Sequence, residues 1–414
     1  MVDTVVTHRW PDVEAVPHAP ARAAAVAALL PRIAKRVPFG IARDDSPAGA
    51  PVLRLRRPGH FYRRVGATGL IGLGEAYQAG DWDSDDLAGL LTATAVAMRS
   101  DRLGALRGLG RARHSGWARS LFGAVAPENE QNTVDGARRN IARHYDLSND
   151  FFALFLDETM TYSSALFADA DDEDLAGAQR RKVDRLLDRT GVGAGTRVLE
   201  IGTGWGELAM RAAWRGATVH TITISVAQHA LATRRVREAG LDDRVTVELR
   251  DYRDVSSAEG YDAILSVEMI EAVGDRFWPD YFGALDRLLA PGGRVGLQAI
   301  TVPDDKVQRA AHTTYTWITK YIFPGGVMLS VEEAERQLAR TSLRIAGRQA
   351  FGRDYATTLR LWRERFLAAS GEVGALGFDE IFRRTWEYYL AYCEAGFRSG
   401  EIDVYQLILD RAED

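Results

Sequence analysis

A glycine-rich turn near the middle of the chain brings together residue types that can hold a nucleotide-like cofactor. Gly202, Gly204 and Gly206 follow an apolar run that ends at Ile201, and Glu200 comes just before the first glycine. Glycines let the backbone turn tightly and approach a ligand without side-chain obstruction. The spacing is G-x-G-x-G, not the dinucleotide pattern G-x-G-x-x-G, and the chain has no phosphate-binding G-K-[ST] loop. S-adenosylmethionine, which carries no phosphate, is the favoured cofactor, and a purely structural glycine turn is the alternative.

Four later stretches are expected beside this turn, because ligands of open parallel sheets lie beyond the carboxyl ends of the strands. After the second expected strand, residues 217–223, an acidic residue would normally hold the ribose hydroxyls. This chain has none there, so Thr223 and Gln228 must offer neutral hydrogen bonds instead. Asp251 and Tyr252 are placed for the adenine amino group and ring face. The four stretches are 223–228, 251–253, 268–274 and 298–301.

Glu271 is the residue that most strongly suggests catalysis. It directly follows a predicted buried strand, in apolar company where an unpaired carboxylate is costly. We expect a catalytic or anion-organising role, with a helix cap as the alternative. The sequence has no Ser-His-acid order, no H-E-x-x-H motif and no clustered Cys and His set. It therefore argues against a hydrolase or a metalloenzyme, and we expect no metal.

The elements that would position these residues form an α/β fold, a doubly wound and mainly parallel sheet. We expect a terminal strand pair near residues 343–352 and a helical tail from 356 to 410. Two aromatic-rich segments, 136–175 and 303–342, are predicted to be lid insertions. The expected strands are 197–201, 217–223, 245–249, 261–267 and 293–300, and the expected helices are 175–190, 227–239 and 278–289.

A smaller N-terminal α+β domain, residues 1–123, is predicted to precede a linker at 124–135 and the catalytic domain at 136–414. Residues 1–125 contain 17 Lys and Arg against 11 Asp and Glu, a net charge of +6, whereas the remainder has 35 against 46, a net charge of −11. Between Arg99 and Arg119, six arginines alternate with leucines and Trp117. Such a segment can lie on an anionic membrane surface, and a solvated interdomain helix is the alternative. No nucleic-acid recognition motif accompanies it.

The sequence favours a cytoplasmic protein that is peripheral at the inner face of the membrane. No run approaches eighteen apolar residues, as a transmembrane helix would require, and the first residues are not typical of a signal peptide. Cys393 is the only cysteine, so an internal disulfide is excluded.

Seven motifs between Gly69 and the end of the chain resemble those of the cyclopropane-fatty-acyl-phospholipid synthase family. The resemblance implies a class I methyltransferase that alkylates the cis double bond of an acyl chain in a phospholipid, helped by a lipid-engaging N-terminal domain. It also implies that Tyr162, Ser163, Gly202, Gly204, Thr223 and Gln228 hold S-adenosylmethionine. The motifs are His144-Tyr-Asp-Leu-Ser-Asn-Asp-Phe-Phe152, Met160-Thr-Tyr-Ser163, Leu199-Glu-Ile-Gly-Thr-Gly-Trp-Gly206, Met269-Ile-Glu-Ala-Val-Gly274, Tyr321-Ile-Phe-Pro-Gly-Gly326, Phe351-Gly-Arg-Asp-Tyr355 and Gly396-Phe-Arg398.

Members of the family bind a bicarbonate ion that acts as the base, and the resemblance places its ligands at Ser164, Glu271, Gln298, Ile300 and Tyr355. Ser164 stands where the best-known pattern has cysteine, and Gln298 stands where it has histidine. Serine can keep a main-chain contact, but glutamine cannot carry a positive charge or shuttle a proton. Whether bicarbonate binds this chain is therefore left open.

The implied chemistry passes through a carbocation, which needs a water-free pocket with electron-rich rings. Proton loss with ring closure gives a cyclopropane, whereas a hydride shift before the proton loss gives a methylene branch, the precursor of a methyl branch. The placement of the base decides between them, and both products stay open. The rings expected to line the pocket are those of Tyr145, Phe151, Phe152, Tyr315, Trp317, Tyr321 and Phe323.

Two other functions are weighed against this one. A small-molecule methyltransferase acting on a heteroatom is disfavoured by the aromatic lid and the basic front half. A non-catalytic lipid-binding protein of the same fold is disfavoured by the intact glycine turn. The expected partners are an unsaturated phospholipid and the anionic membrane surface, without nucleic acid. A homodimer is also considered, as is a reductase if the product is a methylene chain.

Overall fold

The computed structural model describes residues 10–37, 39–41, 50–99, 147–169, 173–305, 307 and 315–412. The chain divides by its contacts into two compact units. Unit 1 consists of Met1–Val125, Thr313–Ile322 and Ser370–Ser399, and unit 2 consists of Ala126–His312, Phe323–Ala369 and Gly400–Asp414. Most of the predicted site residues belong to unit 2.

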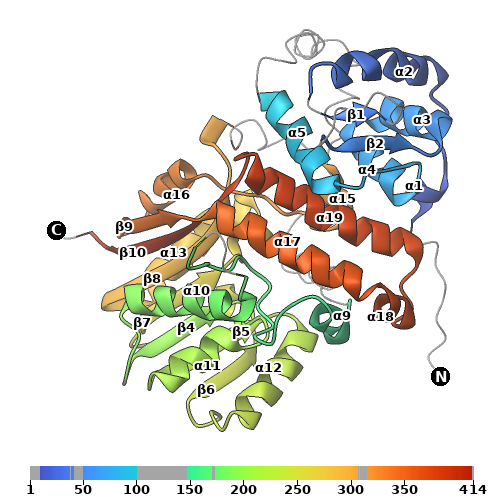
Figure 1. The fold of residues 1–414 in the computed structure, drawn as a ribbon. Helices are drawn as coiled ribbons and strands as arrows, with labels where there is room; N and C mark the ends of the chain where they lie inside the picture. The colour runs from blue at the N-terminus through green and yellow to red at the C-terminus, as the bar shows by residue number, and fades with distance from the viewer. Residues whose placement is uncertain are drawn as a thin grey trace. The chain divides into compact units, whose positions relative to one another are not determined.

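Unit 2 is built on a seven-stranded sheet with the order β6-β5-β4-β7-β8-β10-β9 (Figure 1). The strands from β6 to β8 run parallel to one another, and β10 is antiparallel to both β8 and β9. This is the mainly parallel, doubly wound sheet that the sequence predicts. The strands are β4 (Arg197–Ile201), β5 (Thr218–Thr223), β6 (Val245–Leu249), β7 (Tyr261–Val267), β8 (Leu289–Thr301), β9 (Leu343–Ala350) and β10 (Asp403–Arg411).

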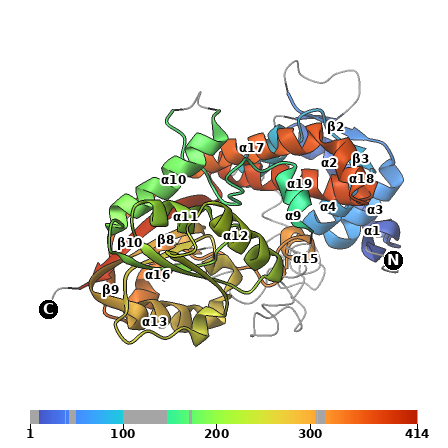
Figure 2. The same cartoon turned by 90° about the horizontal axis from the view of Figure 1, so that it is seen from below.

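Helices cover both faces of this sheet, as Figure 2 shows. Successive side chains of a strand point to opposite faces, so one strand can pack against helices on both sides. In β4, Val198 packs with apolar residues of α10, α11 and α12, whereas Leu199 packs with those of α13 and α16. Both faces are thus apolar, as is typical of parallel sheets between helices. The helices of unit 2 are α9 (Asn149–Ala153), α10 (Leu175–Thr190), α11 (Glu207–Trp214), α12 (Val226–Glu238), α13 (Trp278–Leu288), α16 (Val331–Leu338) and α17 (Gly352–Ala368), with short 3-10 turns at Tyr252–Asp254, Ile270–Ala272 and Asp275–Phe277.

The predicted strands and helices between residues 175 and 301 are confirmed to within a few residues. The prediction for the last part of the chain is wrong in two respects. Residues 343–350 form one strand only, and its partner is β10, which lies inside the predicted helical tail. Strand β10 is buried on both faces, with Leu407 and Leu409 on one and Ile408 on the other, so its sequence lacks the apolar-polar alternation of a half-exposed strand.

Unit 1 contains a small sheet of β1, β2 and β3 with surrounding helices. The predicted domain 1–123 lies inside it, but the unit also includes 313–322 and 370–399, which the sequence analysis assigned to the catalytic domain. Buried hydrogen bonds explain this, since Gln78 donates to Thr385 (2.8 Å) and accepts from Trp317 (2.9 Å). The elements are α1 (Pro11–Glu14), α2 (Pro20–Ala34), β1 (Gly40–Ile41), β2 (Val52–Leu55), α3 (Pro58–Thr68), α4 (Leu70–Gln78), β3 (Trp82–Asp83), α5 (Leu87–Arg99), α15 (Trp317–Tyr321), α18 (Ser370–Ala375) and α19 (Glu380–Arg398).

Several predicted features fall outside the described residues, namely the basic segment beyond Arg99, the linker 124–135 and the first part of the lid at 136–175. Within the described part of the chain, no helix combines the length and apolar character needed to cross a membrane. The same residues contain no cluster of three or more His, Cys, Asp or Glu side chains that could hold a metal ion.

Candidate active site

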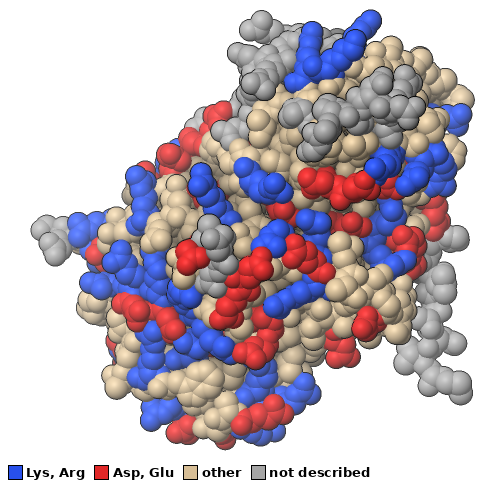
Figure 3. All heavy atoms as spheres, viewed as in Figure 1, with Lys and Arg blue, Asp and Glu red and all other residues tan. Residues whose placement is uncertain are grey.

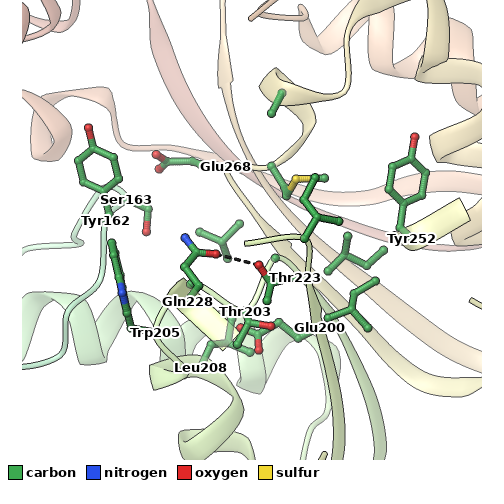
Figure 4. A pocket seen from close by; sticks show the side chains of 18 of the residues that line it. Tyr162, Ser163, Glu200, Thr203, Trp205, Leu208, Thr223, Gln228, Tyr252 and Glu268 are labelled. Atoms are coloured by element: carbon green, nitrogen blue, oxygen red, sulfur yellow. Dashed lines mark hydrogen bonds between the residues drawn. The ribbon is translucent and has the colours of Figure 1, made fainter. Parts of the chain in front are cut away.

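A cavity of about 180 Å³ lies at the carboxyl ends of β4, β5 and β7, where the parallel sheet predicts a ligand (Figure 4). Nine of the ten predicted cofactor residues line this cavity. The tenth, Gly206, is the residue before α11 instead, in a left-handed conformation with a φ of 92°. The nine are Tyr162, Ser163, Glu200, Gly202, Gly204, Thr223, Gln228, Asp251 and Tyr252.

The glycine turn between β4 and α11 is left-handed at two of the positions that line the cavity. Gly202 has a φ of 98° and Gly204 a φ of 51°, values that side chains with a Cβ rarely adopt. A Cβ on Gly202 would lie 2.9 Å from Cγ of Met269, whereas a Cβ on Gly204 would meet nothing within 4 Å. The turn thus needs glycine for its own path, and it leaves open space beside the cavity wall.

The predicted neutral pair after β5 is present. Thr223 Oγ1 donates a hydrogen bond to Gln228 Oε1 at 2.9 Å, as Figure 4 shows, and both side chains are buried. Ser225 begins α12 and its side chain accepts from the Gln228 N–H, which fixes Gln228 in the first turn of the helix. The remaining hydrogen-bonding capacity of this pair suits sugar hydroxyls.

Charged residues of the cavity are tied to partners. Glu200 accepts a 2.5 Å hydrogen bond from Thr221, and burial raises the pKa of its carboxyl to about 8. Asp251 is held by Arg253, whose Nε and Nη2 lie 2.8 and 2.6 Å from its two oxygens. The same guanidinium carbon lies 5.5 Å from the centre of the Tyr252 ring. Asp251 and Tyr252 thus line this end of the cavity together, and their contact with adenine stays a prediction.

Aromatic rings form one wall of the opposite end of the cavity. Phe152 is fully buried, and its ring centre lies 5.2 Å from that of Tyr162 and 5.1 Å from that of Trp205. The ring of Trp362, which sequence analysis did not single out, lies 5.2 Å from Tyr162. Phe151 packs behind Phe152, with their centres 5.6 Å apart. The predicted Phe151 and Phe152 thus belong to an aromatic cluster beside the cavity.

The structure does not bring all the predicted aromatic residues to this cluster. Tyr145 lies outside the described residues, and Phe323 belongs to unit 2 but not to the cavity lining. Tyr315, Trp317 and Tyr321 belong to unit 1. In that unit Tyr321 donates a hydrogen bond to Glu75 at 2.9 Å, and the rings of Trp317 and Tyr388 lie 4.6 Å apart.

Three of the five predicted catalytic residues converge on a carboxylate that the sequence analysis did not name, that of Glu268. Its Oε1 accepts hydrogen bonds from the Ser164 N–H at 2.9 Å and from Gln298 Nε2 at 2.8 Å. Its Oε2 accepts from the Tyr355 hydroxyl at 2.6 Å. Glu268 lines the cavity, and in Figure 4 its carboxylate points toward the side of Tyr162 and Ser163, away from Tyr252.

Gln298 is held in the orientation that this contact needs. Its Oε1 accepts from Nε2 of Gln406, at 3.1 Å, and the two residues face each other in the β8–β10 pair. Gln406 is in turn held by Arg185, whose Nη1 lies 2.5 Å from its Oε1. The amide oxygen of Gln298 is thus engaged, and its nitrogen is left to donate to Glu268. Gln406 was missed because the sequence analysis placed it in a helix.

Glu271 and Ile300, the other two predicted catalytic residues, bind each other. The Ile300 N–H donates to Glu271 Oε1 at 2.5 Å, and Glu271 Oε2 is buried without a hydrogen-bond partner among the described residues. Burial, and secondly the charge of Glu268, raise the pKa of Glu271 to about 8. Glu271 therefore tends to hold its proton near neutral pH.

Lys182 is another residue of the cavity lining that the sequence analysis did not single out. It is 1% exposed on α10, and its Nζ donates to Ser163 Oγ at 2.6 Å. Burial lowers the pKa of the Lys182 ammonium to about 8, and the charge of Glu268 opposes this change. Its spacing from the buried Leu175, Gln179 and Leu186 places it on the inward face of the helix, a signal that the sequence carried.

Comparison with known proteins agrees with this geometry. A family model described as mycolic acid cyclopropane synthetase matches residues 132–407. The tuberculostearic acid methyltransferase UfaA1 of Mycobacterium tuberculosis is 49% identical over 419 residues, which cover 97% of this chain and 95% of that protein. The cyclopropane-fatty-acyl-phospholipid synthase of Escherichia coli K12 is 36% identical over 382 residues, which cover 90% of each.

A solved structure extends the likeness to three dimensions. The mycolic acid cyclopropane synthase CmaA1, complexed with SAH and CTAB, has a TM-score of 0.60 and 30% sequence identity, and the match covers 69% of this chain and 99% of that one. The fold, the motifs and these matches agree, and the chain belongs to the mycolic acid cyclopropane synthetase family, which includes the cyclopropane-fatty-acyl-phospholipid synthases.

Proposed function

We propose that this protein transfers the methyl group of S-adenosylmethionine to a carbon of the cis double bond in an unsaturated phospholipid acyl chain. One observation carries the proposal: the cavity has Asp251 and Tyr252 at one end and a carboxylate, Glu268, beside aromatic rings at its other end. Two relatives support it, since one is a cyclopropane-fatty-acyl-phospholipid synthase and the other is a tuberculostearic acid methyltransferase.

The residues present fit the cofactor. The turn with Gly202 and Gly204 allows a close backbone approach, the Thr223–Gln228 pair suits ribose hydroxyls, and no phosphate-binding group is needed. When bound, S-adenosylmethionine supplies an electrophilic methyl group on a sulfonium. Tyr162 and Ser163 line the cavity at the end where Glu268 lies, which supports the proposal that they orient that group.

An alkene is a poor nucleophile, so much of the rate must come from holding it in line with the methyl group. The aromatic cluster of Phe152, Tyr162 and Trp205 excludes water and offers ring faces that stabilise a nearby cation. A carboxylate at the same end completes the requirement, since the cation must lose a proton to become a stable product.

Proton loss gives one of two products. The relative with 49% identity is named a methyltransferase, whereas the one with 36% identity is named a cyclopropane synthase. The greater similarity favours a methylene-branched chain, in which a hydride shift precedes the proton loss. Ring closure to a cyclopropane is the second candidate product, and a methylene chain would need a separate reductase to become a methyl branch.

The test is an assay with purified protein, S-adenosylmethionine and vesicles of dioleoyl phospholipid. We expect the acyl chains to gain the mass of one CH₂ unit, measured by mass spectrometry of the released fatty acids. Proton NMR of the product then separates the candidates, because cyclopropane protons resonate far upfield and methylene protons in the vinyl region.

The same assay distinguishes the alternatives. If protein with bound cofactor leaves oleoyl lipids unmodified but methylates soluble amines or hydroxyl compounds, the lipid substrate is wrong and a heteroatom methyltransferase takes its place. If calorimetry detects no S-adenosylmethionine binding to folded protein, a non-catalytic lipid-binding protein replaces both.

A further inference from the structure

We propose that the carboxylate of Glu268 is the base that removes the proton, built into the chain at the place where an external anion would otherwise be needed. This inference rests on the function proposed above and assigns a catalytic residue to it. It replaces the expectation that Ser164, Glu271, Gln298, Ile300 and Tyr355 hold bicarbonate.

The hydrogen-bond donors of this site are already engaged by a protein carboxylate. A bound anion needs several donors directed at its oxygens, and this site has three: the Ser164 N–H, Gln298 Nε2 and the Tyr355 hydroxyl. All three donate to Glu268, at distances between 2.6 and 2.9 Å. A protein carboxylate therefore already occupies the anion position.

Bicarbonate does not fit beside this carboxylate. The remaining expected donor, the Ile300 N–H, is engaged by Glu271 at 2.5 Å. An added anion would meet the ionised carboxylate of Glu268 in a partly buried site, where like charges repel strongly. An ionised carboxylate cannot donate a hydrogen bond to that anion.

The carboxyl groups of Glu268 and Glu271 have different surroundings. Burial raises the pKa of Glu268, but its three donors and the charge of Lys182 all act in the opposite direction. Glu271 has one donor and a buried oxygen without a partner among the described residues. Hydrogen bonds to a carboxylate favour its charged form, and Glu268 accepts three whereas Glu271 accepts one. These donors stabilise the ionised form of Glu268, which is the form that a base needs.

The backbone supplies a fourth observation. Glu268 is in the left-handed region with a φ of 49°, a conformation that residues with a Cβ rarely adopt and that costs about 1 kcal/mol or more. Such strain is held in place by surrounding contacts and gathers at functional sites. Here the Glu268 N–H donates to the Gln298 carbonyl at 2.8 Å, and the conformation directs the carboxylate into the cavity.

The proton balance of the step is complete. The positive charge of the sulfonium passes to the alkylated chain as a carbocation. A C–H bond of the new methyl group then breaks, and its electron pair forms the third C–C bond of a ring. If a hydride has first shifted from the methylated carbon to the neighbouring cationic carbon, the same electron pair forms the C=C bond of a methylene instead. The proton bonds to an oxygen of Glu268, which becomes a neutral carboxylic acid and returns the proton to water after the product leaves.

The experiment compares the full-length protein with Glu268→Gln and Glu268→Gly in buffers with and without added bicarbonate, after removal of carbon dioxide. We expect wild-type kcat to be the same in both buffers. Glutamine cannot accept the proton, so E268Q should lose about 100- to 10,000-fold in kcat and stay inactive with bicarbonate. Glycine suits the positive φ and frees the three donors, so E268G should gain activity when bicarbonate is added.

Two control measurements accompany this test. Calorimetric titration with S-adenosylmethionine should give similar affinities for all variants, which shows that they are folded. Glu332→Gln, the same change of charge at an exposed position of α16, should keep wild-type kcat. A wild-type enzyme that needs bicarbonate, or an E268Q variant with wild-type kcat, overturns the proposal.

A binding measurement separates failure of this inference from failure of the proposed function. Carbon-13 bicarbonate should show line broadening with E268G but not with wild-type protein. If the wild type leaves lipids unmodified, the function is wrong, yet this comparison still tests whether Glu268 occupies the anion position. Equal broadening with both proteins would show that it does not.

Discussion

At the scale of single residues, two carboxyl groups a turn apart differ because their hydrogen-bond donors differ. Glu268 receives donors at both oxygens, whereas Glu271 receives one at Oε1. The first is suited to accept a proton, and the second to hold one. This division makes the two glutamates distinguishable by experiments that do not require the substrate.

Glu271→Gln should change how stability depends on pH. Because the pKa of Glu271 is raised from 4.5 to about 8, the folded protein binds more protons than the unfolded chain between these values. The stability that this proton gives is complete below the lower value and is lost as pH rises through the higher one. Relative to E271Q, the wild type should lose about 1–3 kcal/mol between about pH 5 and about pH 8.

Thermal and urea unfolding of both proteins across this range measures the difference. Glu332→Gln serves again as the control, since it removes an exposed carboxyl and should follow the wild-type curve. Parallel curves for wild type and E271Q would contradict a raised pKa at this residue.

Tyr355→Phe should move the pH profile of catalysis. The change removes the 2.6 Å hydrogen bond to Glu268 Oε2, and a hydrogen bond to a charged group contributes about 1.5–3 kcal/mol. The pKa of Glu268 should rise, so the acid limb of kcat should shift to higher pH. A uniform fall in kcat with an unshifted limb would argue that Tyr355 acts in some other way.

The residues of the cofactor end were predictable, because the carboxyl ends of parallel strands must meet at one edge. Glu268 as a base was not, although its stretch 268–274 was expected at the site. Its role depends on donors from Ser164, Gln298 and Tyr355, which lie far apart in sequence. The residues predicted to bind bicarbonate include these three donors, but they do not include Glu268, the side chain that accepts their hydrogen bonds.

At the scale of elements, the glycine turn between β4 and α11 makes the sharpest prediction. Gly202→Ala places a Cβ at a φ of 98° and 2.9 Å from Met269, so it should destabilise the protein by about 1–3 kcal/mol. It should also weaken S-adenosylmethionine binding by at least about tenfold, because the backbone next to the ligand must shift. Chemical unfolding and calorimetric titration measure the two effects.

Gly193→Ala is the matched control for this change. Gly193 lies before β4, outside the left-handed region, and a Cβ there meets nothing within 4 Å. Alanine should be tolerated with no loss of affinity and little change in stability. Equal effects of the two substitutions would mean that the conformation of the turn does not govern cofactor binding.

The parallel part of the sheet could be predicted from sequence because β4, β5 and β7 are followed along the chain by the amphipathic helices α11, α12 and α13. Strand β10 could not, since both of its faces are apolar and it follows two long helices, α17 and α19. Its misassignment had a local consequence, because Gln406, which orients Gln298, lies in this strand. An error in one element thus hid one residue of the site.

At the scale of the whole molecule, charge is distributed unevenly along the chain. On the face drawn in Figure 3, positive and negative side chains lie among one another over unit 2. Ion pairs such as Arg211–Asp184 and Arg215–Asp188 link α10 to α11 and to the residue that follows it. The net positive charge lies in residues 1–125, with five arginines between 102 and 119. We propose that this part of the chain attracts the protein to anionic lipid.

Vesicle co-sedimentation tests that proposal. Binding should be stronger to vesicles with phosphatidylglycerol than to pure phosphatidylcholine, and it should weaken as salt is raised. Replacing Arg102, Arg107, Arg111 and Arg113 by glutamine should cost about 1 kcal/mol of binding for each charge that lies near the surface. Four matched changes at Arg234, Arg237, Arg244 and Arg250 of unit 2 are the control, and an equal loss there would contradict a role specific to the front segment.

The left-handed backbone at Glu268 has a consequence for how such an enzyme can change over time. Glutamate and glycine codons differ at one base, and glycine is the residue that this conformation tolerates best. If Glu268 is the base, one point mutation to glycine would relax the backbone and make the enzyme depend on bicarbonate, formed from dissolved carbon dioxide, as its base. The rate of lipid modification would then depend on the bicarbonate concentration in the cell, and the reverse mutation would remove that dependence.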